Sequence, residues 1–120
     1  MPCDLTQRQP LGCVATYDLV TSFYCAEAIS TTIDAWESYV SNMASLVAPG
    51  GRLFIVALRN ANNYRVFDVT FPATPVNEND WLRLLPTLGF DPARTAVGFV
   101  AVPDFVEEGF DSVCIVGAQK

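Results

Sequence analysis

Few residue types in this 120-residue chain can do chemistry. The chain contains no histidine, so a histidine general base or a Ser-His-Asp triad is impossible. The four cysteines Cys3, Cys13, Cys25 and Cys114 have neither C-x-x-C pairing nor zinc-ligand spacing, so we predict no metal site. Free thiols in an ordinary domain predict a cytoplasmic protein. Carboxylates, hydroxyls and amides remain as the candidate functional groups.

Two apolar segments decide where those groups must lie. Residues 17–23 and 52–58 have the composition of strands, and the second is almost continuously apolar, as in a strand covered on both faces. Residues 31–47 between them have helical periodicity and end at a proline–glycine–glycine stop. One helix joining two strands predicts a parallel pair with a right-handed crossover. Ligands bind beyond the carboxyl ends of such strands, so functional residues should follow Ser22 and Leu58.

The helix predicted over 31–47 has a candidate N-cap at Thr31 or Thr32. Its apolar residues recur at steps of three or four and predict a buried stripe. The stripe consists of Ile33, Trp36, Val40, Met43 and Val47. Beyond the second strand, residues 66–71 predict one short extended piece after an Asn-rich loop. Trp36 and Trp81 both lie on apolar helical stripes and are predicted core residues.

The remainder of the chain predicts a helix over 78–88, shortened or kinked by a proline in its last turn, and strands over 95–102 and 112–118. No helix fits between these last strands, so they must be antiparallel. Residues 1–16 form an irregular lead-in. The predicted fold class is α/β in a single domain of residues 1–120: two parallel strands with a crossover helix, then a helix and an antiparallel terminal hairpin.

Composition narrows the possible partners. The net charge of −6 and the pI near 4.3 argue against binding to nucleic acid or to an anionic membrane surface through basic residues. No apolar run is long enough to cross a bilayer. Apolar residues make up 51% of the chain and charged residues only 17%, which predicts a folded domain with part of its surface covered by something else.

The sequence resembles a known family at several motifs. Asp18–Ser22 and Ser45–Leu53 resemble the fourth strand, the following helix end and the Pro-Gly-Gly turn of class I S-adenosylmethionine (SAM)-dependent methyltransferases. Cys3–Gln7 and Gln9–Gly12 resemble the segment before that strand in the nicotinamide, phenylethanolamine and thioether N-methyltransferase group, and Cys25–Ala28 resembles its next motif. The resemblance covers essentially the whole chain but only the second half of such an enzyme. It implies part of a Rossmann-like methyltransferase sheet.

The resemblance implies SAM as the cofactor. The implied cofactor-binding residues are Asp4, Leu5, Thr21, Ser22 and Phe23. The glycine-rich loop that cradles the methionine end and the acidic residue that holds the ribose in these enzymes do not occur in this sequence. Gly50 and Gly51 cannot replace that loop, because they precede a strand instead of opening a helix. We therefore predict weak or absent SAM binding by the chain alone.

The residues that the resemblance assigns to binding of the methyl acceptor are present in the sequence, in contrast to the glycine-rich cofactor loop. By resemblance Glu27 is the catalytic residue, a carboxylate that orients an amine and helps accept its proton. The implied substrate-binding residues are Tyr24, Glu27, Asn60, Tyr64 and Glu108. The alternatives are a surface carboxylate at Glu27, ordinary turn or packing residues at Asn60 and Tyr64, and a solvated loop at Glu108. Val56 departs from the nicotinamide enzymes, which carry an acidic residue there.

In the complete fold the strand at 17–23 lies in mid-sheet, so here its open edge predicts a partner. A complementing chain, a homodimer or residues 1–16 folding back are the three alternatives, and we favour the first two. The implied function is that of a SAM-dependent small-molecule amine N-methyltransferase-like domain, inactive alone. The alternative is a truncated relative that no longer methylates and serves as a binding or assembly module, or has new chemistry in the substrate pocket.

Overall fold

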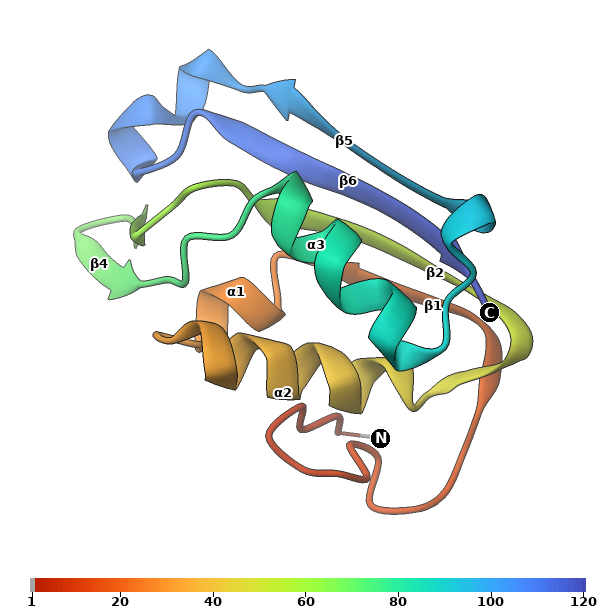
Figure 1. Cartoon of the computed structure of the whole chain (residues 1–120). Helices are drawn as coiled ribbons and strands as arrows, with labels where there is room; N and C mark the ends of the chain where they lie inside the picture. Colours follow the sequence, from red (N-terminus) through yellow and green to blue (C-terminus); the bar gives the residue numbers. More distant parts are fainter. Residues whose placement is uncertain (1) are drawn as a thin grey trace.

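A computed structural model describes residues 2–120 (Figure 1). The central unit consists of β1 (Tyr17–Phe23), helices α1 (Ala26–Ile29) and α2 (Ile33–Ala44), and β2 (Val47–Leu58). Strands β1 and β2 are parallel, as predicted. Strand β2 begins five residues earlier than expected, because Val47 already pairs with Tyr17, before an irregularity in the register that separates this pair from Leu19 and Arg52.

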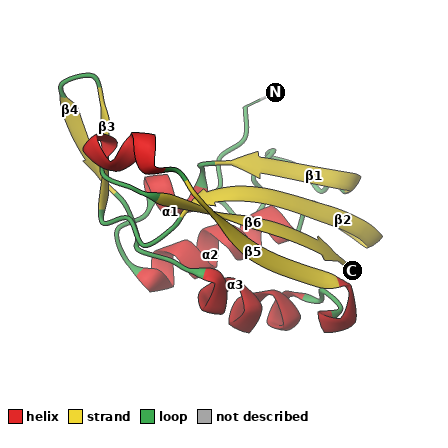
Figure 2. Ribbon diagram, turned by 90° about the horizontal axis from the view of Figure 1, so that it is seen from above, coloured by secondary structure: helices red, strands yellow, loops and turns green. Residues whose placement is uncertain are grey.

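The second half of the chain is built from shorter elements. They are β3 (Asn63–Val66), β4 (Val69–Pro72), α3 (Glu78–Leu84), the 3-10 helices η1 (Leu85–Leu88) and η2 (Pro92–Arg94), β5 (Thr95–Ala101), the 3-10 helix η3 (Pro103–Glu108) and β6 (Ser112–Gln119). Strands β5 and β6 are antiparallel, as predicted. The last strand inserts beside β2, so the sheet order is β1-β2-β6-β5 (Figure 2). This mixed α/β sheet confirms the predicted fold class.

Helix α2 begins where the capping signal indicates. The hydroxyl of Thr32 accepts a hydrogen bond from the backbone N–H of Ala35 at 3.2 Å. Trp36, Val40 and Met43 are buried as predicted, but Ile33 is 38% exposed in the first turn. The helix also ends earlier than 47, because the N–H of Leu46 bonds to the carbonyl of Met43 in a tightened last turn. Val47 is buried, but from strand β2.

Helix α3 shows why the predicted helix over 78–88 changes character. Asn77 and Asp80 form a capping box at its start. Pro86 has no N–H to donate, and the last turn runs on as the 3-10 helix η1. Gly89 then ends it in the left-handed conformation, at φ 93°.

Three elements differ from the sequence expectations. Residues 66–71 were expected as one extended piece, but they form parts of the β3–β4 hairpin, which turns at Phe67 with φ 54°. The 3-10 turns of η3 lie in a segment expected as a loop, and the single turn of α1 lies in residues 24–30, for which no element was predicted. Both are too short to show a helical repeat in the sequence. In Figure 1 the hairpin extends away from the main sheet.

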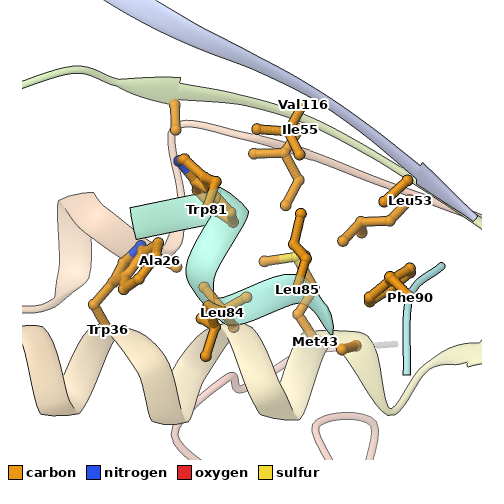
Figure 3. Close-up of a cluster of buried hydrophobic side chains, with 14 of the residues drawn as sticks. Ala26, Trp36, Met43, Leu53, Ile55, Trp81, Leu84, Leu85, Phe90 and Val116 are labelled. Atoms are coloured by element: carbon orange, nitrogen blue, oxygen red, sulfur yellow. The ribbon is translucent and has the colours of Figure 1, made fainter. Parts of the chain in front are cut away.

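The core lies between one face of the sheet and helices α2 and α3, which are on the same side (Figure 1). Trp36 of α2 and Trp81 of α3 meet edge to face, with ring centroids 4.8 Å apart, so both are core residues as predicted. Leu53 and Ile55 of β2 face them across the interface (Figure 3). A smaller buried cluster lies where β2 ends and consists of Leu58, Ala61 and Ala73, with Tyr64 and Phe110 packed against it.

The lead-in packs against helix α2 and leaves the edge of β1 open. The side-chain amide of Asn42 donates to the carbonyl of Leu5 at 2.8 Å, and Leu5 is buried in the core. Among residues 2–120, β1 has a strand partner only on its β2 side, so folding back of 2–16 onto its edge does not occur. No helix in that range is long and apolar enough to cross a membrane.

Candidate functional site

Two strained residues mark the carboxyl ends of the parallel strands. Tyr24 follows β1 and Asn60 follows β2, and both have φ of 54°, in the left-handed region. Asn tolerates this conformation well, whereas for Tyr it is costly and is held here by the hydrogen bond from the Tyr24 N–H to the Val56 carbonyl at 2.8 Å. Strain of this kind gathers at functional sites, and its position agrees with the sequence expectation for residues after Ser22 and Leu58.

Glu27 is a buried carboxylate between these two strand ends. Its side chain is carried by α1 and is 1% exposed. Oε1 accepts a hydrogen bond from the backbone N–H of Leu58 at 2.9 Å. Burial raises the pKa of Glu27 to about 7, and the backbone hydrogen bonds oppose that rise. A carboxyl group with a pKa near neutral is suited to proton exchange, but Glu27 lines neither cavity described below.

A network of polar contacts fixes α1 beneath the strand ends. The hydroxyls of Ser30 and Thr74 lie 2.7 Å apart, and the Thr74 N–H donates to the Glu27 carbonyl at 2.9 Å. The hydroxyl of Tyr64 donates to the carbonyl of Ala28 at 3.1 Å. Tyr64 also stacks on Phe71 at 5.4 Å. These two contacts hold the Tyr64 side chain against α1 and β4.

Four of the five predicted cofactor residues line one cavity, which has a volume of about 400 Å³ and lies along β1. The lining residues are Cys3, Leu5, Val20, Thr21, Ser22, Phe23, Cys25, Met43 and Leu46. Its walls are mostly apolar, which suits a flat ring more than a charged group. Val20, Met43 and Leu46 gave no functional signal in the sequence, because they read as ordinary core residues.

Asp4, the fifth predicted cofactor residue, lies outside this cavity lining. Its Oδ1 accepts hydrogen bonds from the N–H of Thr6 at 3.0 Å and from the Thr6 hydroxyl at 2.6 Å. These bonds lower the pKa of Asp4, the side-chain bond contributing most. In the described chain Asp4 therefore stabilises a local turn.

Asn60 lines a second, smaller cavity of about 220 Å³ between the end of β2 and the loop after η3. The lining residues are Arg59, Asn60, Val106, Gly109, Phe110 and Asp111. Glu108 is half-buried in η3 but is not among them. Of the predicted substrate residues, the structure thus places Asn60 in a cavity, Tyr24 exposed beside the first cavity, and Tyr64 and Glu108 elsewhere.

Sequence reasoning missed the ion pair that fixes the end of β2. Arg59 donates to both oxygens of Glu78, from Nε at 2.7 Å and from a terminal nitrogen at 2.9 Å. The guanidinium also lies over the ring of Phe99 at 3.9 Å. The hydrogen bond from Arg59 lowers the pKa of Glu78 to about 2. No spacing rule relates these three residues, since tertiary folding brings them together.

Comparison with known sequences gives a family match over the whole chain. The sequence model described as the NNMT/PNMT/TEMT family matches residues 1–120. Phenylethanolamine N-methyltransferase of Homo sapiens is 25% identical over 117 residues, covering 94% of this chain and 41% of that protein. Nicotinamide N-methyltransferase of Homo sapiens is 32% identical over 78 residues, covering 63% of this chain and 30% of that protein. The chain spans about two-fifths of the length of the phenylethanolamine enzyme.

Solved structures show the same fold at low identity. A SAM-dependent methyltransferase from Methanosarcina mazei superposes with a TM-score of 0.67 at 11% identity, covering 95% of this chain and 64% of that one. Magnesium protoporphyrin IX methyltransferase from Synechocystis, with bound SAH, superposes with a TM-score of 0.62 at 16% identity, covering all of this chain and 50% of that one. These neighbours confirm the Rossmann-like methyltransferase architecture.

Proposed function

Because the chain belongs to the NNMT/PNMT/TEMT family, we propose that it forms the acceptor-side portion of a SAM-dependent N-methyltransferase acting on a small amine. The observation that carries this proposal is the cavity on the free edge of β1. Leu5 of the lead-in lines it together with the consecutive β1 residues Thr21, Ser22 and Phe23, and these are positions that the family resemblance assigns to the cofactor.

The cavity fits one end of that cofactor. Apolar walls from Leu5, Val20, Met43 and Leu46 suit an adenine ring, and the hydroxyls of Thr21 and Ser22 offer polar contacts. When bound, SAM supplies an electrophilic methyl group. The glycine-rich loop that would hold its charged methionine end is not in this sequence, so a second portion must supply it. That portion is a complementing segment of the family fold, because a second copy of this chain has the same sequence and contributes no such loop.

Glu27 is the proposed proton acceptor on the amine side. A methyl acceptor must be deprotonated before it attacks, and a carboxyl group with a pKa of about 7 exchanges protons efficiently at neutral pH. The Leu58 N–H occupies Oε1, and Glu27 is 1% exposed, so its other oxygen would meet an amine only after the strand ends around it open. We propose Tyr24 and Asn60, which flank Glu27 at the strand ends, as substrate contacts, and Tyr64 and Glu108 as more distant ones.

The proposed compartment is the cytoplasm. Cys3, Cys13 and Cys25 are exposed free thiols, and Cys114 is a buried one. Exposed thiols persist in a reducing environment.

The test is methyl transfer from radiolabelled SAM to phenylethylamine and to nicotinamide. It uses the chain alone and the chain co-expressed with the unmatched portion of human phenylethanolamine N-methyltransferase. We expect transfer only with the second portion present, and its loss in Glu27→Gln but not in the exposed control Glu107→Gln. No transfer in either preparation, with the complex formed, would refute the methyltransferase function.

A second measurement on the same co-expressed pair addresses the alternative function, that of a binding or assembly module. The observation that favours this alternative is that the cofactor cavity lies along β1, whose second edge has no strand partner among the described residues. Calorimetric titration of the co-expressed pair with SAM separates the two functions, because a module that has lost its cofactor as well as methyl transfer should give no heat of binding.

A further inference from the structure

Helix α1 is a single turn that its own sequence does not stabilise. It spans Ala26–Ile29, has no side-chain hydrogen bond at its N-cap residue Cys25, and lies between the start of α2 and the sheet (Figure 1). A helix of this length is unstable in isolation, because nucleating one turn costs more than its few hydrogen bonds return. Contacts with other segments therefore hold α1 in place, and with it the carboxyl group of Glu27.

These contacts form a closed circuit around Glu27. In the segment after β4, the N–H of Thr74 donates to the carbonyl of Glu27 at 2.9 Å. The same segment is bound to the end of β2, because the N–H of Asn60 donates to the carbonyl of Val76 at 2.8 Å. At that strand end the N–H of Leu58 donates to Oε1 of Glu27 at 2.9 Å. Glu27 is thus held at its backbone and at its side chain by two segments that are bound to each other.

The side-chain contact in this circuit is a pair of hydroxyl groups. The oxygens of Ser30 and Thr74 lie 2.7 Å apart, and both residues are 2% exposed. Ser30 donates its single hydroxyl hydrogen to the carbonyl of Ala26 at 2.7 Å, so Thr74 is the donor within the pair. Because the site is buried, removing the hydroxyl of Thr74 leaves the oxygen of Ser30 without its donor or admits water to replace it.

The carboxyl group of Glu27 depends on such neutral contacts, because it forms no ion pair within residues 2–120. The titratable residues of the surrounding segments are Tyr24 and Cys25 before α1, Asp34 and Glu37 of α2, Arg59 after β2, Tyr64 of β3, Glu78, Asp80 and Arg83 of α3, and Cys114 of β6. The charge of Arg59 is compensated by Glu78, and burial raises the pKa of the Cys114 thiol to about 11, so it stays neutral. Burial is therefore what raises the pKa of Glu27 to about 7.

We propose that Ser30 and Thr74 are positioning residues for the proposed methyl transfer, because their hydroxyl pair holds α1 against the end of β2 and keeps water away from the carboxyl group of Glu27. This proposal rests on the proposed function, in which Glu27 accepts the proton of the amine. In this role Ser30 and Thr74 touch none of the reacting atoms. They act through Glu27, since a carboxyl group shielded from water is a stronger base than a hydrated one.

The test follows the ionisation of Glu27 by carbon-13 NMR of its side-chain carboxyl group, whose signal is assigned by its loss in Glu27→Gln. We expect a midpoint near pH 7 in the unchanged chain. In Thr74→Val the midpoint should fall by about 1 pH unit or more toward the ordinary value of 4.5. Thr74→Ser keeps the hydroxyl and should restore the high midpoint. Thr95→Val is the matched control, because it removes a hydroxyl that bonds to the carbonyl of Asp91 at the other end of the sheet from α1 (Figure 1).

Two further variants keep the test decisive if Thr74→Val fails to fold. Ser30→Ala removes the other hydroxyl, and the double variant Ser30→Ala/Thr74→Val removes both, so that neither is left without its partner. The two hydroxyls act as one unit, so the double variant should lower the midpoint about as much as Thr74→Val alone. A purely structural pair would lower the melting temperature and leave the midpoint of Glu27 unchanged. An unchanged midpoint in variants with a native circular dichroism spectrum would overturn the proposal.

Activity of the co-expressed pair gives an independent measurement. In Thr74→Val the acid limb of the kcat/KM profile should move to lower pH by the same amount as the NMR midpoint, and Thr74→Ser should move it back. Methyl transfer with an unmoved midpoint would refute the positioning role alone. Lowered midpoints without methyl transfer in any preparation would refute the proposed function and still support the control of Glu27 by Ser30 and Thr74.

Discussion

Glu27→Gln should change how the stability of this protein depends on pH. The ordinary pKa of a glutamate is 4.5, and burial raises that of Glu27 to about 7. The folded chain therefore holds the Glu27 proton more tightly than the unfolded chain does. Between pH 4.5 and about pH 7 the folded state binds more protons than the unfolded state, so the free energy of unfolding falls as pH rises. The neutral carboxyl group is the stable form inside the protein.

The size of this effect follows from the pKa rise. A difference of roughly 2.5 pH units corresponds to about 3 kcal/mol at 1.4 kcal/mol per unit. Gln keeps an oxygen that can accept the hydrogen bond from Leu58, now 2.9 Å from Oε1, but it carries no charge. We therefore expect the stability of Glu27→Gln relative to wild type to increase by about 3 kcal/mol between pH 4.5 and pH 8.

Urea denaturation at a series of pH values measures this difference. Subtracting the two unfolding free energies cancels the titration of every other group. Glu107→Gln removes the same charge from an exposed site and reports the effect of net charge alone. A wild-type-minus-Glu27→Gln difference that stays constant from pH 4.5 to pH 8 would show that Glu27 is not desolvated in the folded protein, and would remove the support for its role as a proton acceptor.

Three further predictions concern other parts of the chain. Arg59 lowers the pKa of Glu78 to about 2, so the stabilising contribution of Glu78 is present above pH 4.5 and is lost as the pH falls toward 2. In Glu78→Gln, the free energy of unfolding measured with urea should therefore depend less on pH between 4.5 and 2. Gly51→Ala should lower the free energy of unfolding by about 1–3 kcal/mol, because the added Cβ would lie 2.8 Å from a backbone carbonyl oxygen. The control Gly98→Ala places its Cβ in open space, so thermal melts should show no loss of stability for this variant. Burial raises the pKa of Cys114 to about 11, so this thiol should not react with Ellman's reagent at pH 8 until urea unfolds the protein. Rapid reaction of Cys114 in the native protein would contradict its burial in the core.

The sequence predicted much of the fold because the relevant signals are local. The helical repeat through Trp36, Val40 and Met43 and the cap at Thr32 both survive in the structure. The antiparallel pairing of the last two strands followed from the short connection between them. The exposure of Ile33 and the early end of α2 were not predictable, because both depend on where neighbouring elements stop.

The candidate site was predicted less completely. The resemblance indicated Leu5, Thr21, Ser22 and Phe23, and all four line one cavity. It also indicated Asp4, which bonds to Thr6 and lies outside the lining of that cavity. The burial of Glu27 was not foreseen, since a glutamate after a strand is usually on the surface.

By itself the sequence determined the order of the elements, the family and the residue types available for chemistry, because periodicity, turn residues and motifs act over a few neighbouring positions. Only the tertiary structure decided which of those residues meet. The contact of Arg59 with Glu78, the buried carboxyl of Glu27 at the N–H of Leu58, and the hydroxyl pair of Ser30 and Thr74 all arise from segments far apart in the chain. Their energies depend on burial and on distance, and neither quantity exists until the chain has folded.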